Sequence, residues 1–174
     1  DGTVFVGSDD NNLYGVDVAT GEHQWSFETG ERMSSSPTVA DGSVFVGSDD
    51  DNLYAVDAAT GEQQWRFETG DPVWSSPAVA DGIVFVGSND HNLYAMDAAT
   101  GEQQWRFETG EKILSSPTVG DGTVFVGSED NNLYAVHVSS MPADETPAVA
   151  KPKNQENLIQ TTPELELVES DSSE

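Results

Sequence analysis

The sequence predicts an all-β protein built from repeated four-stranded units, and three observations support this prediction. The 174-residue chain repeats with a period of 40, in copies at 1–40, 41–80 and 81–120, followed by a half copy at 121–140. A fixed period of this size indicates a repeat architecture whose units are stabilised by stacking on their neighbours. Each copy also contains four short runs rich in Val, Phe, Tyr and Trp, and turn residues separate these runs. Because no segment carries a long 3.6-residue pattern, the runs indicate strands.

The second copy shows where the strands are expected. Its four predicted strands are Ser43–Gly47, Leu53–Asp57, Gln64–Glu68 and Ser76–Ala80. The run Val44-Phe45-Val46 is apolar on both faces, whereas a sheet with one solvated face would alternate. A small sheet that is buried on both sides lies between two similar sheets. Four antiparallel strands per unit, with each unit between its neighbours, are the blade arrangement of a β-propeller.

Two dipeptides predict the turns within each unit. Asp41-Gly42 lies between two predicted strands and suits a type I′ hairpin, which needs positive φ at both central residues. Thr60-Gly61 is typical of a type I turn closed by a left-handed glycine. The equivalent dipeptides are Asp81-Gly82, Asp121-Gly122, Thr20-Gly21 and Thr100-Gly101.

A spaced motif begins in the second predicted strand of each of the first three copies and ends in the third predicted strand. In the second copy it consists of Ala55, Asp57, Thr60, Gly61 and Trp65. This pattern resembles the tryptophan-docking motif of pyrroloquinoline-quinone (PQQ)-type propeller repeats. The other two copies of the motif are Gly15, Asp17, Thr20, Gly21 and Trp25, and Ala95, Asp97, Thr100, Gly101 and Trp105. In the fourth copy His137 replaces the Asp, Ser139-Ser140 replaces Thr-Gly, and no Trp follows, so the resemblance covers residues 1–140.

The resemblance implies a structural role for these fifteen residues. Each Trp would stack on the backbone of an adjacent blade, where Gly and Ala leave room for its ring. The Asp would accept hydrogen bonds from the turn backbone, as short polar side chains do. None of the motif residues is expected to be catalytic.

The resemblance also implies a strand order and an incomplete ring. The segment Ser75–Ala80 would be an innermost strand, so that the chain begins on the second strand of a blade. Two complete blades follow at about 33–68 and 73–108, and three strands of a fourth blade end the repeats, which gives about three and a half blades. Since rings of the family have seven or eight blades, we expect either an excerpt of a longer protein, a ring closed by two copies, or a marginal half-ring. The segment Glu164–Val168 is a candidate to replace the missing outer strand of the last blade.

Composition excludes several functions. The formal net charge is −26 and only six residues are Lys or Arg, so nucleic acid binding and attachment to anionic membranes are not expected. No apolar run is long enough to insert into a membrane as a helix. The density of carboxylates resembles that of haloarchaeal proteins, in which molar salt screens their repulsion. The absence of Cys excludes disulfides, thiol catalysis and cysteine metal sites.

The last 34 residues have a different character. Residues 141–174 are acidic and contain four Pro and scattered Ser and Thr. Such a composition cannot bury much apolar area and is typical of a disordered tail or linker.

No catalytic or metal site is expected. The three histidines, His23, His91 and His137, fall at different places in the unit and do not converge. The loops Asp49–Asn52 and Asp9–Asn12 carry hard oxygen ligands but lack the spacing of a calcium-binding loop, so they are interpreted as solvated turns. Trp74 stands where the other copies have Ser34 and Leu114. It is a weak candidate for stacking on a cofactor, and filling a gap between blades is the alternative.

Three functions remain open. The first is a non-catalytic scaffold that binds a protein partner and could self-associate through open blade edges. The second is a fragment of a quinoprotein dehydrogenase, in which PQQ and Ca²⁺ would require a complete ring. The third is a sensor domain fused to a kinase or another effector. The resemblance favours an extracytoplasmic location, secreted or at the cell surface, with the cytoplasm as the alternative.

Overall fold

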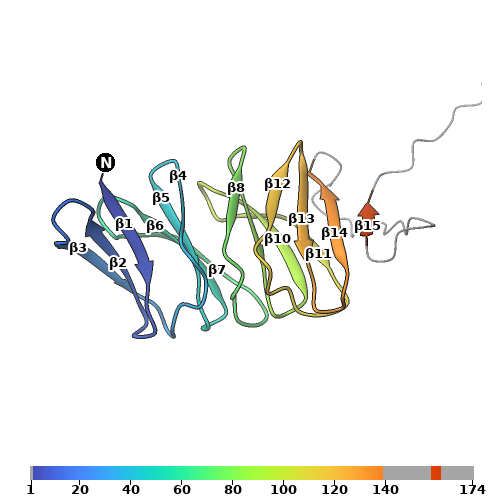
Figure 1. The fold of residues 1–174 in the computed structure, drawn as a ribbon, viewed down its shortest axis with the longest axis horizontal. Helices are drawn as coiled ribbons and strands as arrows, with labels where there is room; N and C mark the ends of the chain where they lie inside the picture. The colour runs from blue at the N-terminus through green and yellow to red at the C-terminus, as the bar shows by residue number, and fades with distance from the viewer. Residues whose placement is uncertain (1, 139–157, 162–174) are drawn as a thin grey trace, which may run out of the picture.

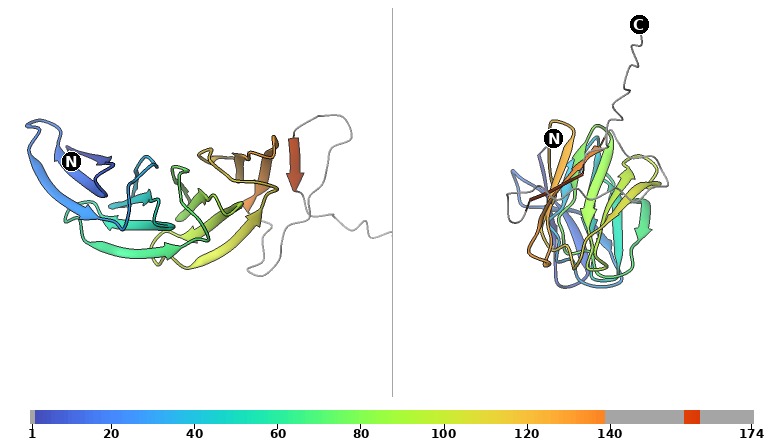
Figure 2. Two further views of the ribbon diagram at one scale, coloured as in Figure 1. Left: turned by 90° about the horizontal axis from the view of Figure 1, so that it is seen from below. Right: turned by 90° about the vertical axis from the view of Figure 1, so that its right-hand side faces the viewer.

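The structure is a computed structural model that describes residues 2–138 and 158–161, and these residues form four separate β-sheets (Figure 1). We call the sheets blades 1 to 4 in chain order. They fan out in an arc, with the short strands β4, β8 and β12 on the concave side and β3, β7 and β11 on the convex side (Figure 2). The structure therefore confirms a partial β-propeller, and the described residues contain no helix that could span a membrane.

The strand order within each blade is the one that the sequence predicts. Blade 1 has three strands, β1 (Thr3–Gly7), β2 (Asn12–Asp17) and β3 (His23–Glu28). Blade 2 contains β4 (Thr38–Ala40), β5 (Ser43–Gly47), β6 (Asn52–Asp57) and β7 (Gln63–Glu68). Blade 3 contains β8 (Ala78–Ala80), β9 (Ile83–Gly87), β10 (Asn92–Asp97) and β11 (Gln103–Glu108). Blade 4 contains β12 (Thr118–Gly120), β13 (Thr123–Gly127), β14 (Leu133–His137) and β15 (Leu158–Thr161).

The turns have the backbone conformations that their residues favour. Asp41 and Gly42 have φ of 48° and 80°, as the two central residues of a type I′ hairpin require. Gly61 has φ of 75°, which is the left-handed region that glycine enters without strain. The equivalent residues of the other copies have similar values of φ, so the same turn residues form the hairpin in each copy.

The outer strand of blade 4 comes from the tail. β15 pairs in parallel with β14, with Leu133 opposite Leu158 and Ala135 opposite Gln160. The sequence prediction placed such a strand at Glu164–Val168, which lies outside the described residues. Four residues of the tail, which the sequence predicts to be disordered as a whole, are therefore a strand.

The core lies between the blades. All five residues of β5 are buried, as the prediction of burial on both faces requires. Phe45 and Leu53 of blade 2 belong to one apolar cluster with Val84 and Val86 of blade 3. Similar clusters join blades 1 and 2 and blades 3 and 4. Each blade is thus stabilised by its neighbours, because apolar area is buried only when sheets stack.

Candidate functional site: the contacts between blades

Trp25 and Trp65 each join two blades through the ring nitrogen. Trp25 Nε1 in β3 donates a hydrogen bond to Ala58 O of blade 2 at 3.2 Å, and Trp65 Nε1 in β7 donates to Ala98 O of blade 3 at 3.0 Å. Since the two donors are equivalent and both acceptors lie just after a third strand, the contact is the same at both interfaces. A buried indole N–H finds its partner in this way.

The glycine of each turn makes room for the indole ring. A Cβ atom added at Gly61 would lie 2.7 Å from Trp25 Cδ2, and one at Gly101 would lie 2.6 Å from Trp65 Cδ2. A separation this short would force the ring to move. Within blade 1, a Cβ at Gly15 would lie 2.5 Å from Trp25 Cε2, so the ring is in contact with its own blade as well as the next.

The aspartate of the motif holds the turn that receives the ring. Asp57 Oδ1 accepts hydrogen bonds from Ala59 N at 3.0 Å, Thr60 N at 2.9 Å and Thr60 Oγ1 at 3.0 Å. Asp17 and Asp97 accept the equivalent set. The bond from the Thr60 backbone is the first of the causes that lower the pKa of Asp57, because donors stabilise the ionised form.

A second set of contacts between blades was not foreseen. Asp50 Oδ2 accepts a hydrogen bond from Gly30 N of the preceding blade at 2.6 Å and another from Tyr54 OH of its own blade at 2.7 Å. Asp90 does the same with Gly70 N at 2.7 Å and Tyr94 OH at 2.6 Å. The third set consists of Asp130, Gly110 and Tyr134.

These bonds correct the interpretation of the Asp49–Asn52 loop as a solvated turn. Asp50 in this loop connects two blades, although the loop lies on the surface. The signal in the sequence is the spacing, since a Tyr follows each of these Asp residues by four positions and a Gly precedes it by twenty. We call the three sets (Gly30, Asp50, Tyr54), (Gly70, Asp90, Tyr94) and (Gly110, Asp130, Tyr134) the Gly–Asp–Tyr sets.

The Gly–Asp–Tyr sets change the ionisation of their members. Burial and then the bond to Asp50 raise the pKa of Tyr54 to about 12. Burial acts to raise the pKa of Asp90, but the hydrogen bonds from Tyr94, Gly70 and Asn92 outweigh it and lower the pKa. Both shifts favour the charged carboxylate next to the neutral phenol, which is the hydrogen-bonded state.

The structure does not bring the remaining candidate residues together. His23 is in β3, His91 is in the loop after β9 and His137 ends β14. Within residues 2–138 and 158–161 no group of three or more His, Asp or Glu side chains could hold a metal ion. Trp74 lies between β7 and β8 and is 37% exposed.

One buried polar atom lies in the hairpin loop of blade 3. Asn89 is 3% exposed, and its Oδ1 has no hydrogen-bond partner among the residues that the structure describes. The equivalent Asp49 pairs with Arg32 Nε at 2.6 Å and accepts a bond from Ser34 Oγ at 2.9 Å. In the next copy Pro72 and Trp74 replace these two donors, which explains why Asn89 lacks a partner.

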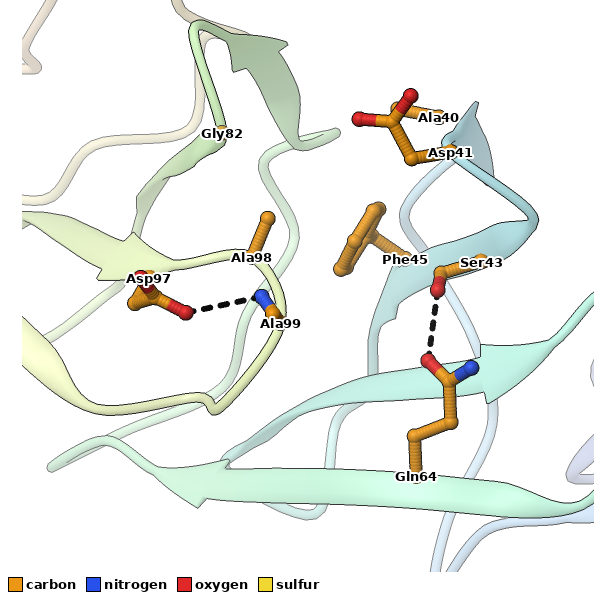
Figure 3. A pocket seen from close by; sticks show the side chains of 9 residues that line it. All are labelled: Ala40, Asp41, Ser43, Phe45, Gln64, Gly82, Asp97, Ala98 and Ala99. Carbon is orange, nitrogen blue, oxygen red and sulfur yellow. Dashed lines mark hydrogen bonds between the residues drawn. The ribbon is translucent and has the colours of Figure 1, made fainter.

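A pocket of about 550 Å³ lies between blades 2 and 3 (Figure 3). It is lined by Ala40, Asp41, Ser43, Phe45, Gln64, Gly82, Asp97, Ala98 and Ala99. Ser43 Oγ donates to Gln64 Oε1 at 2.6 Å, and the Asp97 carboxylate is already bonded to its own turn. Its lining contains two carboxylates and no basic residue, so it does not fit PQQ, an anionic quinone.

The fold and the blade contacts together define the class of protein, a PQQ-like β-propeller repeat protein. The profile of the family described as outer membrane protein assembly factor BamB matches residues 1–76 and 51–140. The chain therefore belongs to this family. A search of curated proteins gave no match.

Solved structures show the same fold. BamB from Moraxella catarrhalis is 22% identical with a TM-score of 0.73, over 80% of this chain and 44% of that one. The computationally designed Ika4 protein is 17% identical with a TM-score of 0.73, over 79% of this chain and 86% of that one. A europium-containing methanol dehydrogenase is 22% identical with a TM-score of 0.57, over 63% of this chain and 23% of that one. The aligned part of the chain thus covers less than half the length of this BamB structure.

Proposed function

We propose that the chain is part of a non-catalytic PQQ-like propeller that acts as a scaffold for a protein partner. The observation that carries this proposal is that the repeated polar and aromatic residues serve as structural contacts. The Trp, Asp and Tyr of successive copies are engaged in contacts within or between blades. Membership in a family described as an assembly factor supports a role in protein interaction.

The fifteen motif residues would serve this function by fixing the spacing between blades. A rigid array presents loops at both ends of its sheets as a continuous surface, which is how repeat proteins bind partners. The family further supports an extracytoplasmic location for the parent protein, as its description refers to the outer membrane.

A quinoprotein dehydrogenase fragment is the second candidate, and the similarity to a methanol dehydrogenase favours it. Titration of the chain with PQQ and Ca²⁺, followed by absorbance and by dye reduction with an alcohol, separates the two functions. The scaffold predicts no saturable binding and no dye reduction. Saturable, calcium-dependent binding would contradict it. A sensor domain is the third candidate, and it predicts a catalytic domain encoded next to the tail.

The acidic surface supports a halophilic origin. With a net charge of −26, like charges repel within the folded chain, and molar salt screens this repulsion. We expect the far-ultraviolet circular dichroism to be most strand-rich in molar KCl. An equally strand-rich spectrum in dilute buffer would contradict a halophilic origin.

A further inference from the structure

The pocket between blades 2 and 3 has buried side chains inside and exposed side chains at its rim. Phe45 is 1% exposed and Ser43 is 9% exposed, while Asp41 and Gln64 are exposed. Figure 3 shows Asp41 and Gln64 of blade 2 on one side of the pocket and Asp97 of blade 3 on the other. The pocket is therefore a cavity of about 550 Å³ to which both blades contribute polar groups.

The size of this pocket depends on two small residues. Ser43 begins β5 and Ala98 follows β10, and the equivalent positions at the next interface hold Ile83 and Val138. Both of these larger side chains pack against the apolar cluster between blades 3 and 4. The space that Ile83 and Val138 take up with apolar atoms is thus left open by Ser43 and Ala98.

The lining of the pocket carries negative charge. It contains the carboxylates of Asp41 and Asp97 and no Lys, Arg or His. The hydrogen bonds that Asp97 accepts from Ala99 and Thr100 all end on Oδ1, so Oδ2 has no partner among the residues that the structure describes. The bond from the Thr100 backbone is the first cause that lowers the pKa of Asp97, so this carboxylate is ionised at neutral pH. The pocket therefore offers a cation a free carboxylate oxygen beside apolar surface.

We propose that this pocket binds the side chain of an arginine that a protein partner presents. The inference rests on the proposed scaffold function and names the chemistry that the partner supplies. An arginine side chain combines an apolar stem, which lies along Phe45 and Ala98, with a cation at its tip. The planar guanidinium has five donors and can face carboxylates from two blades, whereas the compact ammonium of lysine is more strongly hydrated.

The charge of the whole chain favours a basic partner. With a formal net charge of −26, the chain attracts basic segments from solution. The pocket then selects among these segments, because its shape and its two carboxylates suit one kind of basic side chain. A side chain bound between blades 2 and 3 also stabilises their stacking, since it binds only the folded arrangement.

Nuclear magnetic resonance of the isotope-labelled chain tests the pocket, with the capped peptide acetyl-Gly-Arg-Gly-amide as the probe. The titration is made at the lowest KCl concentration that keeps the chain folded. We expect saturable shifts of the backbone amide signals of Gly82 and Ala99, which line the pocket. The same peptide with citrulline in place of arginine has an uncharged side chain of nearly the same shape and should give no saturable shift. An equal response to both peptides, or no saturable response to the arginine peptide, would overturn the proposal.

Asp41→Asn and Asp81→Asn form a matched pair of variants. Each removes one negative charge from the same position of a type I′ hairpin, and Asn followed by Gly suits this turn. Of the two residues, Asp41 lines the pocket between blades 2 and 3. Asp41→Asn should therefore weaken binding of the arginine peptide several-fold, and Asp81→Asn should leave it unchanged. Equal weakening by both variants would show that the peptide responds to net charge alone, and the proposal would fail.

Ala98→Val tests the cavity without changing the charge. Val138 occupies the equivalent position in blade 4, so the larger side chain has a precedent in this chain. The variant should lose the saturable shifts while circular dichroism shows unchanged strand content. Unchanged affinity in the folded variant would overturn the proposal, and if the variant does not fold, the Asp41 and Asp81 pair decides. None of these outcomes affects the quinone titration, which tests the scaffold itself.

Discussion

Two features restrict substitution at Gly61, its left-handed backbone conformation and its contact with a Trp ring. A matched pair of substitutions can separate their effects on stability. Both Gly61 and Gly21 have a left-handed φ, of 75° and 72°, but only Gly61 lies under a Trp ring. We expect Gly21→Ala to cost about 1–2 kcal/mol for the backbone alone. Gly61→Ala should cost about 1–3 kcal/mol more, because its Cβ displaces Trp25. Equal losses in denaturant unfolding would contradict a docking role for Trp25.

Asp51 is a residue at which charge opposes folding. Burial raises its pKa, and the nearby carboxylates of Asp71 and Asp50 raise it further. A raised pKa means that folding disfavours the charged form at neutral pH. We therefore expect Asp51→Asn to stabilise the chain in dilute buffer, by roughly 0.5 kcal/mol or less because the group is largely solvated. The residue has φ of 68°, which Asn accepts, and Asn occupies the equivalent positions 11 and 131.

Salt provides the check on Asp51→Asn. Thermal unfolding should show that the variant is more stable than the unsubstituted chain in dilute buffer. The difference in stability should disappear in molar KCl, where the repulsion between carboxylates is screened. Glu62→Gln is the control, because Glu62 is exposed on a turn and its removal should change little. A gain that persists unchanged in molar KCl would show that the effect is conformational and not electrostatic.

The tryptophan motif can be recognised in the sequence, whereas the Gly–Asp–Tyr sets cannot, and the reason is chemical. The motif combines a Trp with small residues at a fixed spacing, and few structures other than a packed ring need this combination. The spacing therefore identified Trp65 and Gly61 together. Asp50 lies in a run of polar residues typical of any surface hairpin. Nothing local to that run shows that its carboxylate reaches the backbone of Gly30 in another blade.

At the scale of elements, the Gly–Asp–Tyr sets connect one hairpin to the blade before it. We expect Tyr94→Phe to cost about 1.5 kcal/mol, because Asp90 loses a charge-assisted bond while half-buried. Tyr14→Phe is the control and should cost less. Within the described residues Asp10 has the bond from Tyr14 but none from a preceding blade. Equal losses in denaturant unfolding would show that the connection between blades adds nothing.

The same tyrosines predict how stability falls at high pH. The pKa of Tyr54 in the folded chain is about 12, and the ordinary value is 10. A raised folded pKa adds stability below pH 10, and this contribution is lost as the pH rises from 10 to about 12. Unfolding measured across this range should show the decline, with the tyrosinate absorbance appearing late. A tyrosinate titration centred at pH 10 would contradict the burial of the phenols.

The outer strand of blade 4 comes from a different part of the tail than the candidate segment. Glu164–Val168 lies outside the described residues, and β15 (Leu158–Thr161) pairs with β14. Ala135 pairs with Gln160 at the register position where Ala55 pairs with Trp65 and Ala95 pairs with Trp105. This edge of the last blade therefore has the strand pairing of the other blades but not their Trp.

For the whole molecule, the period of 40 residues predicted the repeated four-stranded units, and the resemblance to PQQ-type repeats implied the strand order and the incomplete ring. The same turn residues and strand patterns recur in every copy, so the copies support one another's strand assignment. The last blade was the exception, because its fourth strand comes from a tail with no repeat to compare. The pocket between blades 2 and 3 was also not foreseen, since it depends on how two sheets stack.

The most direct test of the account is the titration of the chain with PQQ and Ca²⁺, followed by absorbance and by dye reduction with an alcohol. A scaffold whose repeated residues form contacts within and between blades predicts no saturable binding and no dye reduction. Saturable, calcium-dependent binding of PQQ would contradict it.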